Sequence, residues 1–184
     1  SKIRILLTDD HTLFRQGIRT LLSAESDIDV VGEAANGSES VEKVGPLRPD
    51  VVLMDIGMPG LSSFEATRQI KKVRPETKIL FLTMYDDEDY LVECMEVGGS
   101  GSVLKDSPAP QLLAAIRDVY RGGSYLSPKM LSQLVVDRER RERLWAIQED
   151  HLIHHPVLTD LGPEPCLLAG FALGPQHRPP TPAP

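Results

Sequence analysis

Residues 51–60 read Val-Val-Leu-Met-Asp-Ile-Gly-Met-Pro-Gly, and this stretch decides the fold. Its first four residues are apolar and two of them are β-branched, which predicts a short buried strand. A strand without polar residues on either face is typical of a parallel sheet that helices cover on both sides. Asp55 follows the strand directly, so we expect it at the carboxyl edge of the sheet, where open parallel sheets bind ligands.

Four similar apolar runs occur along the chain, at Ile3–Leu7, Val30–Val31, Ile79–Leu82 and Val103–Leu104. The segments between the strands carry apolar residues at helical spacings of three and four. The residues that mark these five helices are Leu13, Gly17 and Leu21; Val41 and Val44; Phe64, Thr67 and Ile70; Leu91 and Met95; and Leu112, Ile116 and Val119. Strict alternation of strand and helix predicts an α/β fold, a doubly wound five-stranded parallel sheet with right-handed crossovers.

A break in composition divides the 184 residues. Eight of the 15 prolines and four of the five histidines follow residue 150, whereas no lysine follows Lys129. Proline-rich sequence without periodicity buries too little apolar surface to offset the entropy of ordering it. We therefore predict a compact domain over residues 1–121, a linker with an amphipathic helix over 122–147, and an irregular tail over 148–184.

The composition excludes several classes of protein. The net charge of −7 argues against the broad basic surface of a dedicated nucleic-acid binder. No apolar run approaches the roughly 18 residues of a membrane helix, so we expect no membrane contact. Two cysteines, Cys94 and Cys166, are too few for a disulfide framework. The sequence opens without a signal-peptide pattern, which predicts a cytoplasmic location.

Polar residues follow four of the predicted strands at the edge where the strands end. They are Asp9 and Asp10, Asp55, Thr83, and Lys105. Each has an ordinary explanation alone, because aspartate caps helices, threonine favours strands and surface lysine is solvated. Together, three carboxylates repel one another unless a cation relieves them, and oxygen ligands favour Mg²⁺. A lysine and a hydroxyl at the same point suit a phosphoryl group, with one carboxylate as its acceptor.

Four motifs carry a resemblance to a known family. They are Leu7–His11, Val51–Gly60, Leu82–Glu88 and Val103–Asp106. With these motifs in this order, residues 2–121 resemble the receiver domains of two-component response regulators. Further details, at His11–Gly17, Met84–Glu88 and Arg121–Pro128, are similar to the NarL/FixJ subfamily, whose outputs are LuxR-type helix-turn-helix domains. The fold that this resemblance implies is flavodoxin-like, with strand order 2-1-3-4-5.

The resemblance also implies roles for the strand-end residues. Asp55 is expected to be the phosphoacceptor for a sensor histidine kinase, and Thr83 and Lys105 are expected to contact the phosphoryl oxygens. The expected Mg²⁺ ligands are Asp9, Asp10, Asp55 and the backbone carbonyl of Gly57. No enzymatic activity is expected beyond self-catalysed phosphotransfer and autodephosphorylation. Phosphorylation is expected to change a surface around residues 86–97 and the last strand and helix, and to promote a homodimer.

Two positions depart from the subfamily. Ser102 occupies the place, three residues before Lys105, where an aromatic ring commonly turns inward on phosphorylation. Ser62-Ser63 stands where a glycine near position 63 is usual, so we expect local strain or a shifted turn there.

The region after Pro128 is the larger departure. Its arginines at 138, 140, 141 and 143 alternate with glutamates, which favours a solvated linker helix over a DNA-binding one. The 37 residues from 148 to 184 contain no recognisable helix-turn-helix, so DNA is expected as a partner only through an output domain that this sequence does not display. One hypothesis is that the reading frame shifts near residues 140–150. His151, His154 and His155 have a spacing that could bind a metal ion, but we attribute this spacing to chance.

Other functions remain open from the residues. The chain can be a stand-alone receiver or a phosphorelay intermediate. An aspartyl-phosphate phosphatase of the haloacid dehalogenase type needs a second aspartate two residues after the nucleophile, where this chain has Gly57. Flavin binding needs a Ser/Thr/Gly-rich loop after the first strand, where Asp9 and Asp10 repel phosphate instead.

Overall fold

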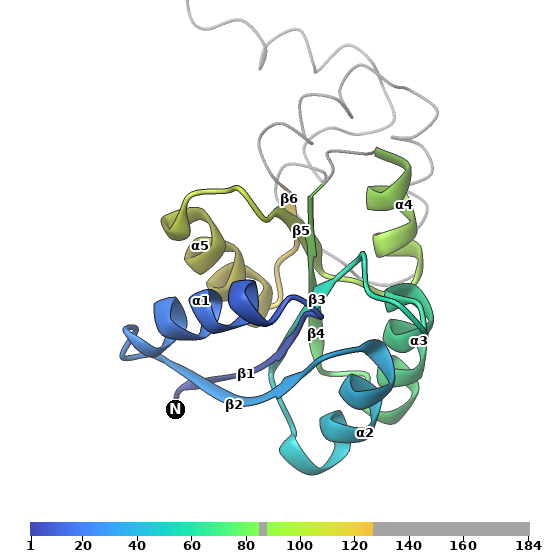
Figure 1. Ribbon diagram of the computed structural model, residues 1–184, viewed down its shortest axis with the longest axis horizontal. Helices are drawn as coiled ribbons and strands as arrows, with labels where there is room; N and C mark the ends of the chain where they lie inside the picture. Colours follow the sequence, from blue (N-terminus) through green and yellow to red (C-terminus); the bar gives the residue numbers. More distant parts are fainter. Residues whose placement is uncertain (85–87, 127–184) are drawn as a thin grey trace, which may run out of the picture.

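The computed structural model describes residues 1–84 and 88–126, and the predicted linker helix and tail lie outside this part of the chain (Figure 1). Strands and helices alternate along it. In chain order they are β1 (Ile3–Thr8), α1 (Thr12–Ser23), β2 (Ile28–Ala34), α2 (Gly37–Leu47), β3 (Val51–Asp55), α3 (Ser63–Val73), β4 (Lys78–Thr83), α4 (Glu88–Glu96), β5 (Gly101–Leu104), α5 (Ala109–Tyr120) and β6 (Tyr125–Leu126). None of the described helices has the length and apolar character needed to cross a membrane.

The strands form a single parallel sheet in the order β2-β1-β3-β4-β5-β6. This confirms the predicted α/β class and the 2-1-3-4-5 order of the first five strands. The predicted strand count is one too low, because β6 adds a two-residue strand beside β5. At Gly101, where φ is +153°, an added Cβ would lie 2.1 Å from the Tyr125 carbonyl oxygen, so a glycine is what lets β6 approach.

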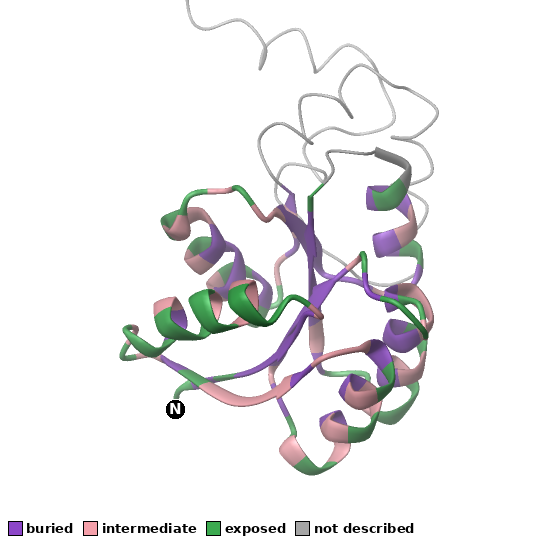
Figure 2. Cartoon of the chain, viewed as in Figure 1, coloured by how far each residue is buried: buried purple, intermediate pink, exposed green. Residues whose placement is uncertain are grey.

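Helices cover both faces of the sheet, with α1 and α5 on one side and α2, α3 and α4 on the other (Figure 1). Successive β1 residues point to opposite faces, so Ile5 and Leu7 join one buried cluster and Leu6 joins the other. The central strands are buried along most of their length (Figure 2). This double burial explains why the strands read as continuous apolar runs rather than alternating ones.

The turn before α3 differs from the strain expected at Ser62-Ser63. The left-handed backbone falls on Gly60, with φ +86°, and Arg48 is the only non-glycine residue with positive φ in the described chain. Ser62 is instead the N-cap of α3, and its side chain accepts a hydrogen bond from the Glu65 amide. Of the two expected outcomes, local strain or a shifted turn, the structure shows no left-handed backbone at Ser62-Ser63, because Ser62 caps the helix and the left-handed residue of this turn is Gly60.

Cys94 is buried on a helix. Its side chain lies in α4 within the cluster on the α2–α4 side of the sheet. Burial raises the pKa of this thiol far above its usual value, which keeps it protonated and unreactive.

Candidate functional site

The carboxyl ends of β1, β3 and β5 bring two carboxylates and one ammonium group into direct contact. Lys105 Nζ lies 2.7 Å from Asp9 Oδ2 and 3.0 Å from Asp55 Oδ1. The side chains of Asp9, Asp55 and Lys105 are 0%, 4% and 5% exposed, so this ion-paired group forms a buried floor. Asp10 lies beside it and is 28% exposed.

Local hydrogen bonds fix the backbone around Asp9. The amide of Asp9 donates to the Ala34 carbonyl of β2, and the amide of His11 donates to Asp9 Oδ1 at 2.8 Å. The Arg15 guanidinium donates to the Asp9 carbonyl oxygen and to Glu33 Oε2. The first turn of α1 and strand β2 therefore hold Asp9 from two sides.

The backbone around Asp55 is held from the start of α3. The buried Ser63 hydroxyl donates to the Asp55 carbonyl oxygen and, at 3.2 Å, to that of Ile56. The Gly57 amide donates to Asp55 Oδ1 at 3.3 Å. These contacts orient the Asp55 carboxylate toward the strand ends. Sequence reasoning missed Ser63 as a positioning residue, because its contact with Asp55 depends on how α3 packs.

Thr83 and Lys105 are joined through the backbone at the ends of β4 and β5. The Lys105 amide donates to the Thr83 carbonyl oxygen at 2.8 Å, and Thr83 is buried at 3% exposure. Lys105 Nζ also lies 4.6 Å from the centre of the Phe14 ring of α1, a cation–π contact. The amide–carbonyl bond ties the end of β4 to the end of β5.

The electrostatics of the site favour an added cation. Burial, followed by the Asp9 charge, raises the pKa of Asp55 against the opposing influence of Lys105. Burial also lowers the pKa of Lys105, but its hydrogen bonds to Asp9 and Asp55 outweigh burial and raise it overall. Asp55 Oδ2 is buried without a hydrogen-bond partner. A buried carboxylate oxygen with no donor, in a cluster with more negative than positive charge, fits a divalent metal ion.

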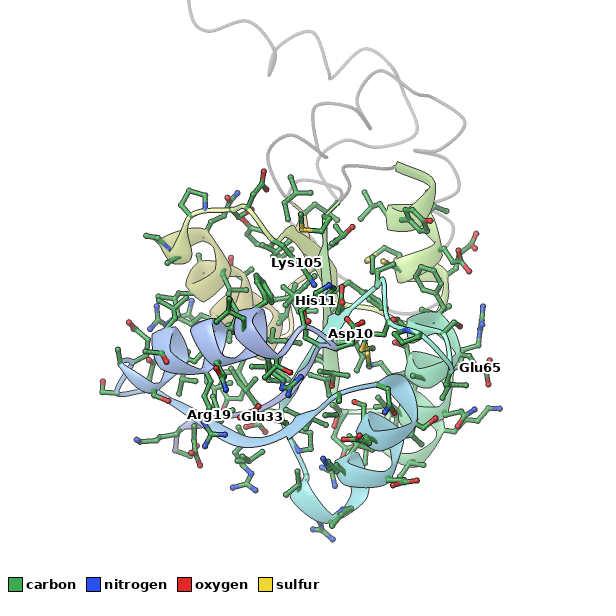
Figure 3. All side chains as sticks on the ribbon, in the orientation of Figure 1. Asp10, His11, Arg19, Glu33, Glu65 and Lys105 are labelled. Carbon is green, nitrogen blue, oxygen red and sulfur yellow. The ribbon has the colours of Figure 1, made fainter. Side chains whose placement is uncertain are left out.

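His11 belongs to the same cluster, although sequence reasoning gave it no role. One ligand atom from each of Asp9, Asp10, His11 and Asp55 lies within 4.8 Å of all the others. Figure 3 shows Asp10, His11 and Lys105 gathered at one edge of the sheet. The available signal was the position of His11 directly after two aspartates at a strand end.

The sequence matches a family model described as the response regulator receiver domain over residues 5–117. Oxygen regulatory protein NreC of Staphylococcus carnosus is 46% identical over 134 residues, which cover 72% of this chain and 62% of NreC. Transcriptional regulatory protein DegU of Brevibacillus brevis is 39% identical over 140 residues, which cover 76% of this chain and 59% of DegU. The chain therefore spans less than two thirds of the length of these curated relatives.

Solved structures give the same result. A LuxR-family two-component response regulator from Aurantimonas sp. SI85-9A1 is 34% identical, with a TM-score of 0.72 over 76% of this chain and 99% of that one. The signal receiver domain of NarL from Mycobacterium tuberculosis is 31% identical, with a TM-score of 0.64 over 66% of this chain and 98% of that one. With the family model matching well over half of the sequence, this chain belongs to the response regulator receiver domain family.

Proposed function

We propose that the chain is the phosphoacceptor of a two-component system, and that Asp55 receives a phosphoryl group from a sensor histidine kinase. The observation that carries the proposal is the pairing of Lys105 Nζ with both Asp9 Oδ2 and Asp55 Oδ1 in a buried floor. An ammonium group within 3.0 Å of a buried carboxylate can balance the charge that a phosphoryl group brings there.

Asp9, Asp10, Asp55 and the backbone carbonyl of Gly57 are the proposed Mg²⁺ ligands. When bound, Mg²⁺ supplies positive charge that offsets the carboxylates and the incoming phosphoryl oxygens. The buried, unpartnered Asp55 Oδ2 supports this assignment, because such an oxygen is costly without a cation or donor. Asp55 Oδ1 is engaged by Lys105 and by the Gly57 amide, so Oδ2 is the oxygen of this carboxylate that remains available to a cation.

Lys105 and Thr83 are proposed to contact the phosphoryl oxygens after transfer. The Lys105 amide and the Thr83 carbonyl form one ladder bond, so movement of one residue toward the phosphoryl group draws the other strand end with it. This coupling matters here because Ser102 is buried on β5, opposite Phe81 in the strand register, and offers no ring that could turn. The proposed switch therefore runs through the backbone of β4 and β5.

The wider roles are proposals of the same kind. Regulation of transcription is suggested by the name of the relative DegU, a transcriptional regulatory protein. A homodimer formed on phosphorylation and DNA contact through an output domain are proposed from the resemblance to the NarL/FixJ subfamily. A cytoplasmic location follows from a kinase partner that transfers phosphate inside the cell. The frameshift hypothesis for residues 140–150 concerns sequence outside the described part of the chain. A helix-turn-helix sequence in another frame of the coding DNA supports that hypothesis, and its absence from all frames contradicts it.

Intact-mass measurement after incubation with acetyl phosphate and Mg²⁺ tests the central proposal. The expected result is a gain of one phosphoryl group, which is lost in Asp55→Asn and when a chelator removes the metal. Asp118→Asn, which changes an exposed carboxylate of α5, is the matched control and is labelled like the wild type. Labelling that persists in Asp55→Asn would disprove the assignment of Asp55. Multiple turnovers of an added phosphate ester would favour the phosphatase alternative instead.

A further inference from the structure

His11 stands at the open rim of the acidic cluster. Its Nδ1 lies 3.0 Å from Asp10 Oδ1 and 3.5 Å from Asp9 Oδ1, and its side chain is 70% exposed. The backbone amide of His11 donates to Asp9 Oδ1 at 2.8 Å, and this bond holds the ring near that carboxylate. The ring is not hydrogen-bonded to Asp10, whose Oδ1 is buried without a hydrogen-bond partner.

The spacing also fits ligands of a common ion. Two ligand atoms that each lie about 2.1 Å from one metal are about 3.0 Å apart at a right angle and about 3.4 Å apart at the tetrahedral angle. The two separations in the structure, 3.0 Å and 3.5 Å, match these values.

A second observation points independently to a ligand at this place. Asp55 Oδ2 is buried and has no hydrogen-bond partner, on a side chain that is 4% exposed. Exposure rises from Asp9 through Asp10 to His11, from 0% to 28% to 70%. Buried oxygens thus form the floor of the cluster, and a ring nitrogen stands on the side from which an ion arrives from water.

We propose that His11 is a metal ligand that makes this site bind Co²⁺, Ni²⁺ and Zn²⁺ more tightly than Mg²⁺. The proposal rests on the proposed function, because it assigns the same carboxylates to a divalent cation. Imidazole suits Co²⁺, Ni²⁺ and Zn²⁺, whereas Mg²⁺ prefers oxygen ligands and retained waters. The nitrogen therefore adds affinity for the first group of ions and little for Mg²⁺. His11 decides which cations compete with Mg²⁺ at the phosphoacceptor.

Metal titration of the full chain tests this assignment. Chelator-treated wild type, His11→Ala and His11→Gln are titrated with CoCl₂, read by visible absorption, and with MgCl₂, read by calorimetry. Asp10→Asn is the control, because it is expected to weaken the binding of both Co²⁺ and Mg²⁺. The histidines at 151, 154, 155 and 177 remain in every protein, so cobalt held by them cancels in the comparison. We expect the Co²⁺ Kd to rise at least about tenfold in both His11 variants, because mutation even of an indirect partner of a metal ligand lowers metal affinity by about 10–100-fold. We expect the Mg²⁺ Kd to change by less than about twofold.

A spectroscopic measurement separates ligation from a general effect on folding. Pulsed electron paramagnetic resonance of the Mn²⁺-loaded protein reports a ring nitrogen coupled to the metal, and this signal is expected to be lost in His11→Ala. Unchanged Co²⁺ affinity in His11→Ala, or an equal loss of affinity for Co²⁺ and Mg²⁺, would overturn the role of His11. If acetyl phosphate still labels Asp55 in that case, the proposed function stands without a role for His11. The reverse result, cobalt bound through His11 without any labelling of Asp55, supports the metal site and contradicts the proposed function.

Discussion

Replacing Asp55 by asparagine is expected to stabilise the metal-free protein, even though it breaks an ion pair. The site holds three carboxylates against one ammonium group. Like charges 4.8 Å apart, the outer limit for these ligand atoms, repel by about 3.5 kcal/mol at an effective dielectric constant near 20. The attraction between Lys105 and Asp55, at 3.0 Å, is about 5.5 kcal/mol with the same dielectric constant.

The balance for Asp55 is unfavourable. Repulsion by Asp9 and Asp10 together is about 7 kcal/mol on that scale, which exceeds the attraction of Lys105 by about 1.5 kcal/mol. Partial exposure of Asp10 reduces this excess, whereas burial of the Asp55 charge adds to it. We therefore expect Asp55→Asn to raise the free energy of unfolding by about 1–3 kcal/mol in metal-free buffer.

Urea unfolding followed by circular dichroism, with chelator and with excess Mg²⁺, measures this difference. Mg²⁺ stabilises the wild type more than the variant, because a cation that binds only the folded state adds its binding free energy. The gain from Asp55→Asn should therefore shrink or reverse with the metal. The control Asp118→Asn should stay within about 0.5 kcal/mol of the wild type in both buffers. A loss of stability in Asp55→Asn without metal would refute the reasoning, because it would mean that the Lys105 ion pair outweighs the repulsion.

Three further results are expected. Ser63→Ala should destabilise the chain by about 1–3 kcal/mol and slow acetyl phosphate labelling, because it removes the donor from the buried Asp55 carbonyl and the partly buried Ile56 carbonyl. The cap variant Ser62→Ala should cost about 1 kcal/mol and leave the labelling rate unchanged, and equal labelling rates in the two variants would contradict the positioning role of Ser63. Gly101→Ala should lower the free energy of unfolding by about 1–3 kcal/mol and speed hydrogen exchange in β6, because the added Cβ would lie 2.1 Å from the Tyr125 carbonyl oxygen. The control Gly17→Ala, whose Cβ meets nothing within 4 Å, should stabilise α1 by about 0.5–1 kcal/mol. An unchanged exchange rate in β6 would contradict this account of Gly101. Burial, together with the nearby positive charge of Lys78, lowers the pKa of Lys71 from 10.5 to about 8. The folded chain therefore loses this proton at a lower pH than the unfolded chain, so the stability of the wild type relative to Lys71→Met should rise from about pH 8 to about pH 10.5. Urea unfolding over this pH range measures the difference, and a difference that does not change with pH would show that the pKa is not lowered.

The α/β class was predictable because parallel strands covered on both faces are continuous apolar runs in the sequence. Val51–Met54 and Ile79–Leu82 are apolar on every residue, since both of their faces are covered, and the residue after each run marks its carboxyl end. Asp55 and Thr83 could therefore be assigned to one edge of the sheet before any tertiary contact was known.

The missed features depend on contacts between distant segments. Strand β6 has two residues, too few to show any periodicity, and it exists because Gly101 leaves room for it. The N-cap role of Ser62 is local, because its hydroxyl accepts from the Glu65 amide three residues later. The role of Ser63 cannot be predicted from local sequence, because α3 must pack before its hydroxyl can reach the Asp55 carbonyl.

The sequence by itself determined the α/β class and the set of polar residues at the strand ends, because burial on two faces and strand termination are local properties of the chain, whereas the order of the strands came from the resemblance to receiver domains. Only the tertiary structure decided how those residues are used. It put Lys105 between Asp9 and Asp55, and it brought Asp55 into one cluster with His11. Such distances arise from packing between strands far apart in sequence, and a charge cluster acquires its chemistry from distances that no local pattern encodes.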